Sequence, residues 1–189
     1  VDSSGTVRVA ATSDADASTL ATGLAYSKDA DTGVGAAVAM NYGNLTNTAA
    51  IGAGANISAG SVEVEAGSTS GQSHDFEVTA LAGGGSTQSE DGESTTGVAG
   101  AAGINVINAT TTASIAAGAT TTTTAGNVDV TARRDLGIQN LVGGGALTTS
   151  DNGKSIGLAV GVNVIDNTTT ALVEAATVNA AQDVTVTAD

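Results

Sequence analysis

The chain of 189 residues contains 26 glycines and is 41% apolar, and its aromatic residues are limited to Phe76, Tyr26 and Tyr42. Because Ala and Val supply most of the apolar content, this composition excludes a core that depends on large aromatic side chains. The net charge of −14 excludes the basic patches that bind nucleic acids and anionic membranes, and no apolar run is long enough to span a bilayer. Cysteine and proline are absent, so disulfides are excluded and no proline interrupts strands that pair on both sides.

Four kinds of strand-like segment follow one another along the chain, and the same order recurs. The first kind is a V-x-V segment that alternates apolar with polar residues, as a strand with one buried face does. The second kind ends near glycines. The third is a near-continuous run of Gly, Ala, Val and Ile, typical of a strand that is buried on both faces or that faces close neighbours, and the fourth is rich in Ala. In chain order, the segments are 7–9, 20–26, 34–42, 49–57, 62–65, 76–81, 98–107, 113–119, 128–130, 136–142, 156–165, 171–178 and 184–186.

An asparagine marks the same place in each recurrence. Asn41, Asn105 and Asn163 are separated by 64 (105 − 41) and 58 (163 − 105) residues. Self-similarity at such a period indicates an array of stacked units. We therefore predict one continuous array over residues 1–189, with repeats at approximately 7–61, 62–127 and 128–183 and a further repeat beginning at 184. Since the chain opens within a repeat and without Met, we expect it to be a piece of a longer protein.

The density of strand signals predicts an all-β fold. Gly and β-branched residues occur throughout, and no cap precedes a 3.6-residue apolar period, so helices are not expected. Tandem β-sandwich modules would need about 100 residues each and larger core side chains. A parallel β-helix needs only small residues stacked in rows, at about 4.8 Å per coil. The short, Ala-rich repeat of about 60 residues therefore favours a right-handed parallel β-helix, or β-solenoid.

Four phrases of the sequence resemble a known family. They are VGAAVAMN (34–41), GLAVGVNV (157–164), DNTTTALV (166–173) and DVTVTA (183–188). These phrases are similar to repeats in very large bacterial surface proteins of the filamentous-adhesin and leukotoxin-like type, and the likeness covers nearly all of the chain. The resemblance implies a right-handed parallel β-helix, secretion to the cell exterior and a structural or adhesive role. It implies no catalytic residues.

An acidic loop lies between the second and third segments of each repeat. Its carboxylates are the candidate calcium ligands Asp29, Asp31, Glu90, Asp91, Glu93 and Asp151. If the repeats stack, these loops form a ridge of the oxygen ligands that Ca²⁺ prefers. However, no loop matches an EF-hand or the glycine-rich nonapeptide of calcium-binding solenoids, and Lys28 and Lys154 lie in two of the loops. Solvated turns are the favoured interpretation, and calcium is the single cofactor retained as a candidate.

The recurring Asn and Thr residues each allow two interpretations. If one repeat forms one coil, the three asparagines stack as an amide ladder. If one repeat forms two or three coils, they are only equivalent bend residues, and we favour this second interpretation. The threonine runs at 110–112, 120–124 and 168–170 suggest an ice-binding face, which needs Thr at the same place in every coil. The first repeat reads Leu45-Thr46-Asn47-Thr48 instead, so β-propensity and solubility explain the threonines better.

Signatures of catalysis are incomplete in this sequence. The single histidine, His74, lies between Ser73 and Asp75, and adjacent residues on a strand point to opposite faces, so the three do not form a triad. A phosphate-loop-like stretch ending at Lys154 has Thr148 where glycine is required. There is no Cys/His cluster for zinc, and no carboxylate lies among the aromatic residues of a sugar subsite. We predict that the chain is not an enzyme.

These observations predict a structural protein of the cell exterior: a stalk, a fibre or an adhesive cell-surface filament. The open strand edges of a stack accept further strands, so self-association, head-to-tail or lateral, is the first partner that we expect. A host or neighbouring-cell surface is the second. A calcium-dependent adhesin segment is the alternative function, and a carbohydrate-active solenoid is less favoured.

Overall fold

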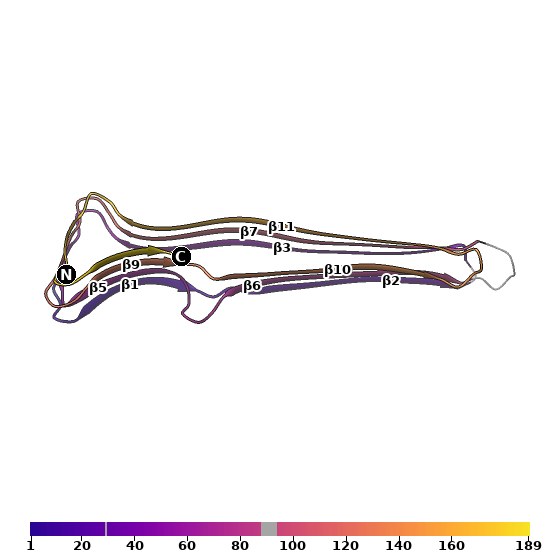
Figure 1. Cartoon of the computed structure of the whole chain (residues 1–189), viewed down its shortest axis with the longest axis horizontal. Coiled ribbons are helices and arrows are strands. Elements are labelled where there is room, and N and C mark those ends of the chain that lie inside the picture. The colour runs from indigo at the N-terminus through magenta and orange to yellow at the C-terminus, as the bar shows by residue number, and fades with distance from the viewer. Residues whose placement is uncertain (29, 88–93) are drawn as a thin grey trace.

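The computed structural model describes residues 1–28, 30–87 and 94–189, and within them every regular element is a β-strand (Figure 1). The chain passes through four strands and then begins the same passage again. The first passage comprises β1 (Thr6–Ser13), β2 (Ala17–Lys28), β3 (Thr32–Ile51) and β4 (Asn56–Ala59). The second comprises β5 (Ser61–Ser68), β6 (His74–Thr87), β7 (Thr96–Ile115) and β8 (Thr120–Thr123). The third comprises β9 (Val128–Arg133), β10 (Leu136–Thr148), β11 (Lys154–Val173) and β12 (Thr177–Asn179), and β13 (Val184–Ala188) follows it.

Each strand pairs in parallel with its counterpart one repeat away. The four sheets have the strand orders β1-β5-β9-β13, β10-β6-β2, β11-β7-β3 and β12-β8-β4. Val62 is in register with both Val7 and Val128, and Asn105 is in register with both Asn41 and Asn163. The all-β, parallel-sheet architecture predicted from the sequence is therefore present.

One prediction about the repeat was wrong. One repeat makes a single passage rather than two or three, because neighbouring strands in every sheet come from successive repeats. The reason is strand length: β3, β7 and β11 are 20 residues long and run without a break from the Gly/Ala/Val segment through the Thr/Asn run. Of the two interpretations of the Gly/Ala/Val runs, close neighbours on one face is the one that applies to these strands, because a Cβ on Gly35 would lie 2.0 Å from the carbonyl oxygen of Gly83. Residues of β3 alternate between buried and exposed, so one face of its sheet meets solvent.

The interior changes character along the long axis of the molecule. In Figure 1 the two layers lie apart at the end that contains both termini and run close together toward the other end. At the wide end, the short strand β4 contributes Ile57 to a core of branched apolar side chains, and β8 adds the buried threonines Thr121 and Thr123. The larger members of this core are Ile51, Ile57, Val62, Val64, Ile115, Val128 and Val130. Between β6 and the β3 and β7 strands, the core consists mainly of alanines with Val78. Bulky apolar side chains therefore fill the space between the layers at the wide end, whereas alanines suffice where the layers lie closer together.

Glycine permits the close approach of the layers at the narrow end. A Cβ atom on Gly84 of β6 would lie 1.9 Å from the carbonyl oxygen of Val98 on β7. A Cβ on Gly35 of β3 would lie 2.0 Å from the carbonyl oxygen of Gly83. No other residue fits where backbone faces backbone at these distances. The glycine clusters thus set the spacing of the layers, and the long strands leave their outer faces free.

Candidate functional site

The predicted calcium ligands are only partly within the described residues. Asp29, Glu90, Asp91 and Glu93 lie outside them. Asp31 directly precedes β3, and its carbonyl oxygen accepts a hydrogen bond from the Thr96 amide at 2.7 Å.

Asp151 lies exposed in the turn before β11, where the Gly153 amide donates to the Ser150 carbonyl at 3.0 Å. Both loops adjoin the same end of the sheet, because Thr32 and Lys154 are each in register with Thr96. Within 1–28, 30–87 and 94–189, no three His, Cys, Asp or Glu side chains are grouped as metal ligands. Calcium binding stays a prediction.

A second acidic surface lies on the outside of β1, β5 and β9. Arg8 on β1 forms an ion pair with Glu65 and approaches Glu63 at 3.6 Å. The hydrogen bond from Arg8 to Glu65 raises the pKa of this arginine above its ordinary value. Asp129 is in register with Glu63, and the depression there, of about 280 Å³, is lined by Glu63, Val64, Glu65, Asp129 and Thr131. Exposed ion pairs of this kind are screened by solvent and contribute little to stability.

Asparagine side chains link the two layers inside the molecule. The amide of Asn41 donates to the carbonyl oxygens of Glu77 at 2.7 Å and Ala17 at 3.2 Å, and its own oxygen accepts from Thr19. The amide of Asn105 donates to the Gln139 carbonyl at 3.2 Å and to Asn163 Oδ1 at 3.1 Å. The amide ladder, which the sequence analysis did not favour, is therefore present between two of the three asparagines. Asn105 and Asn163 are joined by a direct hydrogen bond.

A buried basic pair lies where β6 and β10 begin. His74 is completely buried, and its Nδ1 accepts a hydrogen bond from the Ala15 amide at 3.0 Å. Arg134 is also buried, and its guanidinium donates from Nε to Thr111 Oγ1 at 2.9 Å. Burial lowers the pKa of His74, with a further lowering from the charge of Arg134, and burial lowers the pKa of Arg134. The lowered pKa favours the uncharged form of the His74 imidazole.

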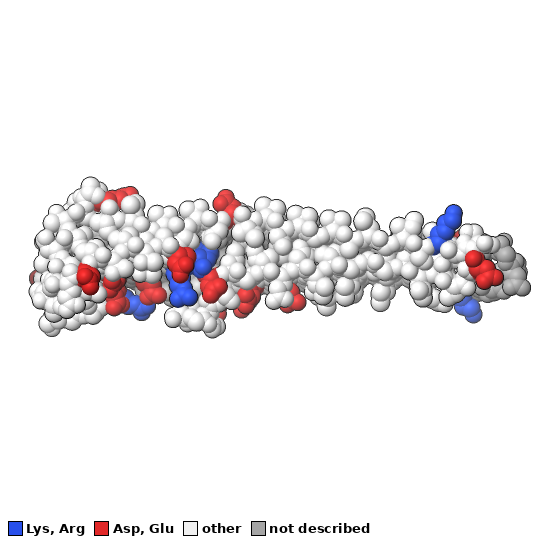
Figure 2. Space-filling view, viewed as in Figure 1, with Lys and Arg blue, Asp and Glu red and all other residues white. Residues whose placement is uncertain are grey.

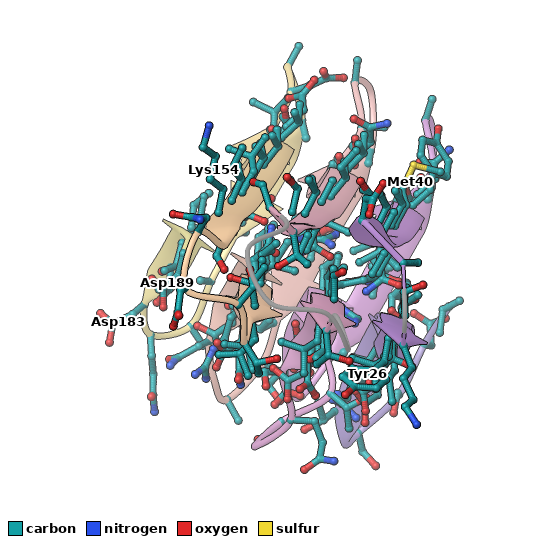
Figure 3. All side chains as sticks on the ribbon, turned by 90° about the vertical axis from the view of Figure 1, so that its right-hand side faces the viewer. Tyr26, Met40, Lys154, Asp183 and Asp189 are labelled. Carbon is teal, nitrogen blue, oxygen red and sulfur yellow. The ribbon has the colours of Figure 1, made fainter. Side chains whose placement is uncertain are left out.

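The outer face of the β3–β7–β11 sheet exposes many apolar side chains, among them Val38, Met40 and Leu158. We call its central part the outer apolar face. Its five cross-strand rows are Val34–Val98–Ile156, Ala36–Gly100–Leu158, Val38–Ala102–Val160, Met40–Ile104–Val162 and Tyr42–Val106–Val164. Figure 2 shows charged residues over the half of the elongated molecule that contains the termini and again near the opposite tip, with an uncharged stretch between them. Figure 3 shows Met40 and Lys154 on this side of the molecule and Tyr26 on the opposite side.

Threonines continue this sheet face toward the wide end. Thr110 is in register with Thr46 and Thr168, and Thr112 is in register with Thr48 and Thr170, so each long strand presents two threonines. The first repeat, which reads Leu45-Thr46-Asn47-Thr48, therefore carries threonine at both shared positions. Asn47 points inward, where its amide donates to Ser13 Oγ at 2.9 Å, and it separates two outward threonines. The two rows cover only two alternate positions of each strand.

The sequence analysis missed the outer apolar face and the buried Arg134. Alternate positions of 32–44, 96–108 and 154–166 are mostly apolar on both sides of the strand, so the pattern resembles that of a doubly buried strand. No pattern in the sequence indicated that Arg134 is buried, because the residue it hydrogen-bonds, Thr111, lies 23 residues away.

No family model matches this chain, and no curated protein or solved structure is detectably similar to it. In the part of the chain that the structure describes, no helix has the length and apolarity needed to cross a membrane.

Proposed function

We propose that this chain is a segment of a structural β-solenoid, a right-handed parallel β-helix in which each repeat forms one coil. In this role it acts as a stalk, fibre or adhesive filament on the exterior of a bacterial cell and not as an enzyme. The observation that carries the proposal is the unbroken register between repeats, in which all 20 residues of β7 pair with β3 on one side and β11 on the other. Right-handed crossovers between parallel strands are the general rule.

The mechanical argument follows from the register. Every coil adds four strands whose backbone groups hydrogen-bond to the coil before and the coil after, so an array resists extension along its whole length. The strands β10, β11 and β12 are outermost in their sheets, as are β2, β3 and β4 on the other side. Such edges accept further strands of the same kind. This supports self-association, and the resemblance to bacterial surface repeats supports the extracellular location.

Solution scattering on a chain that carries the repeats twice in tandem tests the proposal. Each added repeat is expected to lengthen the particle by about 4.8 Å along the stacking direction and to leave its cross-section unchanged. Where such chains also associate end to end through their open strand edges, negative-stain microscopy should show filaments. Two separate bodies joined by a linker would contradict the proposal, because they would show that the repeats do not stack across the join.

A calcium-dependent adhesin is the second candidate, supported by the position of Asp31 and Asp151 at the same end of the β3–β7–β11 sheet. Calcium that binds only the folded chain raises the unfolding temperature with concentration. Thermal unfolding with calcium, and then with excess chelator, measures this effect, and magnesium serves as the control. An unfolding temperature that does not respond to calcium would rule out this candidate.

A further inference from the structure

We propose that the outer apolar face pairs with the same face of a second copy of this chain, about a two-fold axis that sets the long strands antiparallel across the interface. The inference rests on the proposed structural role, for which it names the partner and the surface. In this arrangement β11 lies over β11 of the partner, β7 over β7 and β3 over β3.

The charges that border the face are self-complementary. Lys154 lies six residues before Val160 (160 − 154) and Asp166 six residues after it (166 − 160), all on the outward side of β11. A two-fold axis through the row of Val160 therefore brings each Lys154 to an Asp166 of the other copy. The residues between them that share this side are apolar: Ile156, Leu158, Val160, Val162 and Val164.

The shape of the face on β7 is self-complementary as well. The same axis passes through Ala102, which is in register with Val160. It places Ile104 of one copy opposite Gly100 of the other. A Cβ atom added at Gly100 would have no heavy atom within 4 Å, so the space above this glycine is open. On β3, Met40 comes opposite Ala36 in the same way, so that large side chains meet small ones in both strands.

The alternative two-fold axis, parallel to the strands, gives a poorer fit. It would place Ile104 on Ile104 and Gly100 on Gly100, and it would leave Lys154 opposite Thr32. The antiparallel arrangement also keeps the stacking direction of the two copies the same. Pairing can therefore continue from coil to coil in a longer array. Packed sheets keep their strand directions within about 30° of each other, which the side chain of Lys154 can span.

On the opposite outer face, formed by β2, β6 and β10, neighbouring side chains cover three of the glycines. A Cβ on Gly83 would lie 2.7 Å from Leu24, one on Gly85 would lie 3.2 Å from Tyr26, and one on Gly143 would lie 3.1 Å from Leu81. Gly145 of β10 is as open as Gly100, so the open glycine does not by itself select a face. The choice of the β3–β7–β11 face rests on the placement of Lys154 and Asp166.

The area of the face is sufficient for a specific contact. From Thr32 to Asn44 each strand extends about 40 Å, and three strands span about 14 Å, which gives about 600 Å² per copy and about 1,200 Å² in total. This total is at the lower end of the range for specific protein–protein interfaces. We therefore expect reversible pairing that strengthens with each coil added to the array.

Sedimentation equilibrium of the whole chain and of charge variants tests the pairing. Lys154→Glu (net charge −14 − 2 = −16) and Asp166→Lys (−14 + 2 = −12) should each raise the dissociation constant about three- to tenfold. The double variant restores both the pairs and the net charge of −14, and should restore the affinity. Asp166→Lys decides between mechanisms: general charge repulsion predicts tighter association as the net charge falls, and the specific pair predicts weaker association.

Two further comparisons test the shape and the choice of face. Leu158 on the pairing face and Leu141 on the opposite face are similarly exposed, at 62% and 60%. Leu158→Glu should abolish pairing and Leu141→Glu should leave it unchanged. Gly100→Val should fill the open space above this glycine and weaken pairing without loss of monomer stability, measured by unfolding of each variant.

A wild-type chain that stays monomeric at several hundred micromolar overturns the inference, and so does an Asp166→Lys variant that associates as tightly as the wild type. Neither result contradicts the stacked array, provided that solution scattering still shows the tandem chain lengthening with each repeat. Normal pairing by a chain whose tandem form fails to lengthen would refute the array and not the interface.

Discussion

Substitution of the internal asparagines gives the sharpest test of how the two layers are held together. Asn41 and Asn105 occupy the same row, and alanine removes the same atoms from each, so the cavity contributions nearly cancel in a comparison. Asn41 has all of its polar groups paired: two donated hydrogen bonds and one accepted from Thr19. At about 1 kcal/mol for each bond, Asn41→Ala should lower the free energy of unfolding by about 3 kcal/mol.

Asn105→Ala should cost much less, although Asn105 is the more deeply buried of the two. Its amide donates two hydrogen bonds, but its Oδ1 is buried without a partner. Loss of the two bonds costs about 2 kcal/mol, and removal of an unsatisfied buried oxygen returns about 1–3 kcal/mol. The net change in the free energy of unfolding should therefore be within about 1 kcal/mol of zero.

Urea unfolding followed by circular dichroism measures both values. With an m-value of about 2 kcal/mol/M, the midpoint should fall by about 1.5 M for Asn41→Ala and by less than about 0.5 M for Asn105→Ala. Equal shifts, or a larger shift for Asn105→Ala, would refute the reasoning, because they would show that depth of burial outweighs the count of satisfied hydrogen bonds.

Three other properties follow from the structure. His74 is faced by Arg134 and by Asp14 and Asp16, and its lowered pKa means that, as the pH falls, the unfolded chain binds a proton before the folded chain does. The free energy of unfolding should therefore decrease as the pH falls below about 6.5. Urea unfolding at pH 7.5 and at pH 5.5 measures this decrease, which should be smaller in the His74→Gln variant. Gly84→Ala should destabilise the chain by about 3 kcal/mol or more, because its Cβ would lie 1.9 Å from the Val98 carbonyl oxygen. The control variant Gly100→Ala should be neutral or stabilising, because the space there is open. Equal melting temperatures for the two variants would contradict the packing described for the narrow end. Ile115→Ala should lower the free energy of unfolding by about 2–5 kcal/mol, because Ile115 is fully buried in the core of the wide end. Ile156→Ala, at an exposed position, is the matched control. A comparable decrease in the control would show that burial does not determine the size of the effect.

The repeats were predictable from the sequence because the V-x-V segments and the asparagines recur in a constant order. The all-β class followed from the density of glycine and β-branched residues. The number of coils per repeat was not predictable, since it depends on where strands end. The Thr/Asn runs 44–48, 108–112 and 166–170 carry turn-forming residues, yet they lie within single strands of 20 residues. Pairing with both neighbours outweighs the local preference of Asn for turns in these strands.

Sequence alone determined which residues repeat, how often they do so, and that small side chains dominate, because these properties are local and are counted along the chain. Only the tertiary structure decided which face of each long strand lies inside. Gly100 and Gly103 look alike in the sequence, but one opens to solvent and the other faces Val78 and Val142 across the interior. The physical reason is that a strand made of glycine, alanine and valine has no polar side to mark its outside, so the facing layer alone distinguishes its two faces.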